Sequence, residues 1–129
     1  MANLTKASPS LATMVPDASH QLTLPAATDL AVGDLVYIAS TGKFTKTDGT
    51  SANAAAQWYG MVNRAAKADE PVTAYQDVVF EYSTGLTPGA RYYASTTAGL
   101  LDTATTTGGD VPCAFAVSTT RIHVMSPRK

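Results

Sequence analysis

The chain has 129 residues, 15% of them charged, and a formal net charge of -1. This length suits one domain with one core, and the near-neutral charge argues against nucleic acid or an anionic membrane as a partner. No segment approaches the ~20 apolar residues that span a bilayer, and no secretion signal opens the chain, so we expect no membrane anchor.

Residues 1–17 predict an extended arm. The segment has neither helical nor alternating periodicity, and it contains Pro9 and Pro16. Its apolar residues are spaced along it: Leu4, Leu11, Met14 and Val15. A flexible tail would not need such anchors, whereas an arm that becomes ordered on a neighbouring protein surface would use them. Both interpretations remain open from these residues alone.

Residues 18–129 predict a single all-β domain. Glycine, proline and aspartate turn signals recur at short intervals, and short strands fit between them. One helical turn or a loop is expected over 51–57, where three alanines favour helix. The expected strands are 20–24, 35–39, 58–64, 72–74, 78–82, 91–95, 113–117 and 121–125.

An internal repeat relates residues 30–74 to residues 86–125. Leu30-Ala-Val-Gly33 corresponds to Leu86-Thr-Pro-Gly89, and Tyr59-Gly-Met-Val62 corresponds to Cys113-Ala-Phe-Ala116. Each copy reads as a hairpin unit with one apolar face, and neither copy is large enough to bury that face alone. We therefore expect two similar halves packed together as a compact small β-barrel or β-sandwich of about eight short strands, preceded by the extended arm. Gly33, Gly89, Gly42 and Gly99 are expected to adopt positive φ in the turns of this unit.

The residues that could carry chemistry favour no enzyme. His20 and His123 each alternate with apolar residues and have no partner at metal-ligand spacing. Cys113 is the single cysteine, and its apolar surroundings predict a buried thiol. Neither a nucleophile motif nor a phosphate-binding glycine loop is present. We expect no catalytic residue, no metal and no cofactor.

Adjacent aromatic residues are the clearest sign of an interaction surface. Trp58-Tyr59 and Tyr92-Tyr93 lie in expected strands, where neighbouring side chains point to opposite faces. One member of each pair should then leave the core side, and exposed aromatics on a surface with few charges suit a protein interface. Packing of all four rings within the core is the alternative.

Two segments resemble structural proteins of tailed phages. The pattern found in those proteins is an L-x-P-G-x-x-Y-Y stretch that leads through a glycine turn to a V-G-x-A strand and a final L/I-x-V strand. This chain resembles it in Leu86-Thr-Pro-Gly-Ala-Arg-Tyr-Tyr-Ala-Ser, then Gly99-Leu-Leu, then Val111-Pro-Cys-Ala-Phe-Ala-Val. Leu30-Ala-Val-Gly-Asp-Leu-Val-Tyr resembles the opening strand of phage head decoration domains. The resemblance covers residues 30–125, and Cys113-Ala114 stands where Val-Gly is common, one small pair for another.

The resemblance implies a capsid decoration (cement) protein. Such a protein is made in the host cytoplasm, binds the outer surface of the major capsid protein lattice, commonly as a homotrimer, and stabilises the shell without an active site. For the capsid contact we expect the arm residues Leu4, Leu11, Met14 and Val15; for the subunit interface we expect Trp58, Tyr59, Tyr92 and Tyr93. A head- or tail-fibre module that binds a host receptor or glycan through the same aromatics is the alternative.

Overall fold

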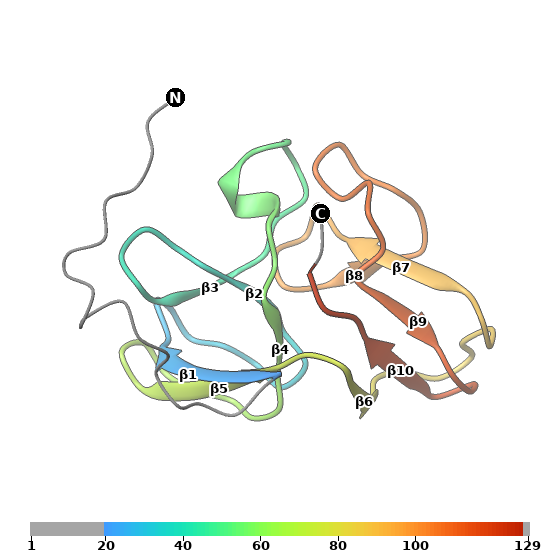
Figure 1. Cartoon of the computed structure of the whole chain (residues 1–129), viewed down its shortest axis with the longest axis horizontal. Helices are drawn as coiled ribbons and strands as arrows, with labels where there is room; N and C mark the ends of the chain where they lie inside the picture. Colours follow the sequence, from blue (N-terminus) through green and yellow to red (C-terminus); the bar gives the residue numbers. More distant parts are fainter. Residues whose placement is uncertain (1–19, 128–129) are drawn as a thin grey trace, which may run out of the picture.

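The computed structural model describes residues 20–127, and this part of the chain is all-β. Ten strands form two five-stranded antiparallel sheets, accompanied by one short 3-10 helix, η1 (Ala54–Ala56). Figure 1 shows the sheets as two lobes, the first in blue to green and the second in yellow to red. The expected all-β fold is confirmed. Residues 1–17, the expected arm, lie outside the described residues, and the division into arm and domain stays a prediction.

The first sheet has the strand order β1-β5-β4-β2-β3. Alternation of polar and apolar residues explains its longer strands, because alternate side chains face the core. A parallel bridge between Ala26 and Phe44 brings the end of β1 beside β3, so the sheet curls toward a closed barrel. Its strands are β1 (Gln21–Pro25), β2 (Leu35–Ile38), β3 (Phe44–Lys46), β4 (Gly60–Val62) and β5 (Pro71–Tyr75).

The second sheet has the strand order β6-β10-β9-β7-β8. If five is subtracted from each of these strand numbers, the result is β1-β5-β4-β2-β3, the order of the first sheet, so the two halves share one topology. Gly33 and Gly89 precede corresponding strands, and both have positive φ, 84° and 87°; the same holds for Gly42 and Gly99. The strands are β6 (Val78–Glu81), β7 (Arg91–Ala94), β8 (Leu101–Asp102), β9 (Ala114–Ala116) and β10 (Arg121–Val124).

Adjacent residues of the first sheet contribute to both hydrophobic clusters of residues 20–127. Val36 and Val62 belong to the cluster inside the first half. Leu35 and Met61, one residue earlier in each strand, belong to the cluster of the second half. Because successive side chains point to opposite faces, β2 and β4 are buried on both sides. The side of the first sheet that carries Leu35 and Met61 is therefore the surface on which the second half packs.

Two strands were not expected from the sequence. β3 and β8 have three and two residues, and neither lies inside a longer expected strand, whereas the three-residue strands β4 and β9 lie within 58–64 and 113–117. Each follows the glycine turn of its half, so they are the second strands of the expected hairpins. The helical expectation over 51–57 reduces to the single turn η1, whose start is capped by Asn53.

Candidate interaction surface

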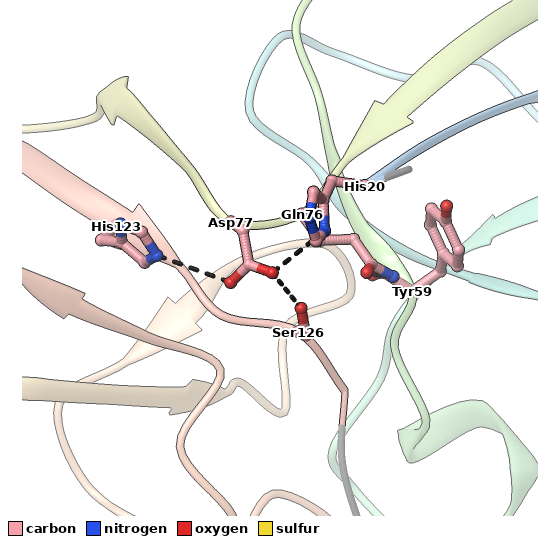
Figure 2. A network of polar contacts seen from close by, with 6 residues as sticks. All are labelled: His20, Tyr59, Gln76, Asp77, His123 and Ser126. Atoms are coloured by element: carbon pink, nitrogen blue, oxygen red, sulfur yellow. Dashed lines mark hydrogen bonds and ion pairs between the residues drawn. The ribbon is translucent and has the colours of Figure 1, made fainter. Parts of the chain in front are cut away.

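Asp77 joins the two halves and both ends of the described chain. It lies in the linker between β5 and β6, and its backbone has positive φ, 53°. One carboxylate oxygen is 3.1 Å from His20 Nδ1 and accepts a hydrogen bond from the Ser126 hydroxyl, and the other is 3.6 Å from His123 Nε2. Figure 2 shows these side chains converging on Asp77 from separate segments. We call Asp77, His20, His123 and Ser126 the clasp.

The geometry of the clasp fits a structural role. In a Ser-His-Asp relay the imidazole lies between the hydroxyl and the carboxylate. Here the carboxylate of Asp77 lies between Ser126 and His123. The Ser126 hydroxyl, followed by the charges of His20 and His123, holds the pKa of Asp77 below its ordinary value. An ionised Asp77 therefore ties the ends to the linker near neutral pH.

The sequence analysis treated His20 and His123 as isolated histidines. In the structure both lie beside the carboxylate of Asp77. The positions are too far apart along the chain for spacing to reveal this. No group of three or more histidine, cysteine or acidic side chains in residues 20–127 has the arrangement of a metal site.

Cys113 is buried, as expected. It lies in the second core cluster and lines a cavity of about 310 Å³ below the loops that follow β3 and β8. Burial raises the pKa of its thiol to about 12. Since the thiolate is the reactive form, this cysteine is a packing residue.

The four aromatic residues expected at a subunit interface are at least half-buried. Tyr92 is in the second core with 7% of its surface exposed, and Tyr93, its neighbour, is half-buried. Trp58 packs against the second core, whereas Tyr59 packs against the first and lies 5.8 Å from the Phe44 ring. Tyr92 and Tyr93 lie in β7, but Trp58 and Tyr59 lie just before β4 (Gly60–Val62) and not in the strand expected over 58–64. The four rings serve partly for packing, and a role between subunits stays a prediction.

The solvent-facing side of the second sheet carries an apolar stripe that the sequence analysis missed. The strand registers place Val79, His123, Phe115 and Arg91 side by side across β6, β10, β9 and β7. Val79 is 54% exposed, and Val117, just beyond β9, is 44% exposed. The rings of Phe115 and His123 stack with their centroids 5.1 Å apart. We call Val79, Arg91, Phe115, Val117 and His123 the outer face.

The outer face has a buried counterpart in the first sheet. There the corresponding row is Gln21, Tyr75, Met61 and Leu35. Met61 and Leu35 are fully buried against the second half, whereas their counterparts Phe115 and Arg91 are half-buried and exposed. Equivalent sides of the two sheets therefore differ: in the first sheet this side packs against protein, and in the second sheet it faces solvent.

No protein-family model matches this chain, and a search of curated proteins returns no match. Residues 20–127 include no helix with the length and hydropathy that crossing a membrane would require.

Proposed function

We propose that this protein is a non-enzymatic virion structural protein that binds the outer surface of a tailed-phage capsid and stabilises the shell. The observation that supports this role most is the outer face, because its counterpart in the same molecule is a protein-packing surface. Exposed or half-buried apolar side chains, Val79, Phe115 and Val117, with His123 between Val79 and Phe115 and Arg91 at the other end of the row, suit a broad protein contact. The resemblance of residues 30–125 to phage head proteins supplies the kind of partner.

The proposal assigns separate contacts to separate parts of the chain. The outer face binds the major capsid protein, and the arm residues Leu4, Leu11, Met14 and Val15 reach neighbouring capsid subunits. Two linked contacts bind more strongly than either alone, since the second forms at high effective concentration. Trp58, Tyr59, Tyr92 and Tyr93 lie near the contacts between copies in a homotrimer.

Co-sedimentation with capsids stripped of this protein tests the proposal. The intact chain should bind saturably, and deletion of residues 1–17 should weaken binding. Val117→Asp should weaken it by at least ~tenfold, because a carboxylate buried in an apolar contact loses hydration without a partner.

Val32→Asp is the matched control. Val32 is 65% exposed, lies in the loop before β2 and is not one of the outer-face residues. Its substitution should leave capsid binding unchanged. Failure of the intact chain to bind capsids, with binding to host cells or polysaccharide instead, would replace the proposal with a fibre module. Equal effects of the two substitutions would remove the outer face from the contact.

A further inference from the structure

The cavity that Cys113 lines is built by both halves of the chain. Its volume of about 310 Å³ lies at the lower end of the range for small-ligand sites, roughly 300–1,000 Å³. Residues of the loop between β3 and β4 form one wall, and residues of the loop between β8 and β9 form another. The two loops lie at the same end of the molecule (Figure 1).

Hydrogen bonds between the two halves hold these loops in place. The Gly49 N–H donates to Ser95 O at 2.8 Å, and the Gly108 N–H donates to Gly49 O at 2.9 Å. A side chain on Gly108 would collide with the backbone of Ser51, so the loops pack without spare room. The walls are therefore formed before any ligand arrives, which lowers the ordering cost of binding.

Three side chains that line the cavity carry hydrogen-bonding groups. Gln57 and Asp110 are exposed, and Trp58 is half-buried. None of these three side chains has a hydrogen bond or an ion pair with another residue of the described range, 20–127. The Gln57 amide offers donors and an acceptor, the Trp58 indole N–H a donor, and the Asp110 carboxylate acceptors. Together these groups supply both donors and acceptors beside an aromatic ring.

This set of groups favours a ligand rich in hydroxyls. A hydroxyl both donates and accepts, so it can use the amide, the indole N–H and the carboxylate alike, whereas an ammonium group only donates and would leave the donors unused. An anion would meet Asp110, which is the one charged residue among the described residues that line the cavity. Neutral sugars combine hydroxyls with an apolar C–H face that can pack on an aromatic ring.

A second hollow shares residues with the cavity. It has a volume of about 140 Å³, and Gln57 and Trp58 line both. Its other lining residues are Tyr37, Ile38 and Tyr59, so two further aromatic rings border it. Two adjoining hollows with aromatic walls suit two linked sugar rings.

We propose that the cavity and the second hollow bind a neutral saccharide of at least two sugar rings, with Gln57 and Asp110 hydrogen-bonded to its hydroxyls and Trp58 packed against a ring. The inference goes beyond the proposed function. No residue of the outer face lines either hollow, so capsid contact and saccharide binding use different surfaces. Contacts between copies would have to border the opening beside Trp58 without covering it.

Tryptophan fluorescence of the full chain tests the inference. Trp58 is the chain's only tryptophan, so its emission reports on this site. Cellobiose, maltose, lactose and chitobiose serve as probes, and at least one should change the emission saturably and shift the Gly108 and Gly109 amide resonances in NMR spectra. Absence of a saturable response to all four in both measurements would overturn the inference. So would tighter binding of glucose 6-phosphate or of choline than of any of the four.

Substitutions test the assigned residues. Gln57→Ala and Asp110→Ala should each weaken saccharide binding by at least ~threefold, since each removes hydrogen bonds to the ligand. Asn63→Ala is the matched control, because Asn63 is exposed and lines neither hollow, and it should leave the affinity unchanged. Affinities equal to that of the parent in both Gln57→Ala and Asp110→Ala would overturn the site.

A second comparison separates this inference from the proposed function. Val117→Asp should weaken capsid binding and leave saccharide affinity unchanged, whereas Gln57→Ala should do the reverse. A protein that binds saccharide but no capsid would keep the inference and remove the proposed function. The opposite result would remove the inference alone.

Discussion

At the scale of single residues, Gly60 of β4 leaves no room for a side chain beside β5. A Cβ at this position would lie 2.3 Å from the backbone oxygen of Tyr75. The corresponding residue of the second sheet, Ala114, carries such a methyl group in a buried strand. The two sheets therefore share a strand order but differ in whether this position has room for a methyl group.

Gly60→Ala should lower the free energy of unfolding by about 1–3 kcal/mol, because the new methyl group forces the backbone of β5 to move. Urea denaturation measures this loss. Ala114→Gly, the reciprocal change, should cost less, about 1 kcal/mol or below, from backbone entropy and a lost methyl contact. A Gly60→Ala protein as stable as the parent would show that β4 and β5 can separate without cost.

Cys113 provides a second test at this scale. With its thiol pKa raised to about 12, almost no thiolate forms at pH 8, and burial blocks access to the sulfur. Iodoacetamide should therefore modify the folded protein far more slowly than the urea-unfolded protein, measured by mass spectrometry. Since the chain has one cysteine, the signal has one source. Comparable rates in both states would contradict the buried position.

At the scale of elements, the clasp holds the linker between β5 and β6 against the two ends of the described chain. Asp77→Asn keeps the shape of the side chain, and asparagine tolerates the positive φ at this position. The substitution removes the charge that faces His20 and His123 and should lower stability near pH 7.

The pH dependence of this loss follows from the lowered pKa of Asp77. A carboxylate with a depressed folded pKa contributes stability above its unfolded pKa of about 3.9. That contribution disappears as the pH falls through the folded pKa. The stability difference between parent and Asp77→Asn should therefore be largest above about pH 5 and shrink below about pH 4, in urea titrations at each pH. A pH-independent difference for Asp77→Asn would contradict the assignment.

Most elements were predictable because their chemistry is local. Every strand of four or five residues matched an expected strand, since an alternating apolar pattern needs about that length to be visible. β3 and β8 were missed, whereas β4 and β9, which have three residues each, lay within the longer expected strands 58–64 and 113–117. The clasp could not be predicted, because its four residues meet only after both sheets have formed. No local pattern distinguishes His123 beside a carboxylate from His123 in solvent.

At the scale of the whole molecule, residues of both halves form the core cluster of the second half, and Met61 is one of them. This residue belongs to β4 of the first sheet but packs in the core of the second half. Met61→Ala should therefore destabilise the protein by about 2–5 kcal/mol, through lost burial and the cavity left behind. Urea denaturation should show one transition with an unchanged slope, since both halves lose the same contact.

Phe115→Ala is the matched control, since Phe115 occupies the corresponding position of the second sheet and is only half-buried. A smaller loss of stability is expected there. Two separate transitions in Met61→Ala would contradict a shared core. The repeat in the sequence suggested equal halves, but it could not say which half would cover the other. The choice depends on which residues occupy equivalent positions: Leu35 and Met61 in the first sheet, Arg91 and Phe115 in the second. Their equivalence is visible only once the strand registers of both sheets are known.

The clasp has a further consequence for chain connectivity. His20 and Ser126 bind the same carboxylate, so the two ends of the described chain lie within a few residues' reach of each other. Proteins with adjoining ends commonly tolerate circular permutation. A short connector from residue 127 to residue 20, with new ends opened in the exposed turn at Thr84-Gly85, would reverse the order in which most of each half is synthesised. The fold depends on which surfaces pack together, so it should form with either half first along the polypeptide.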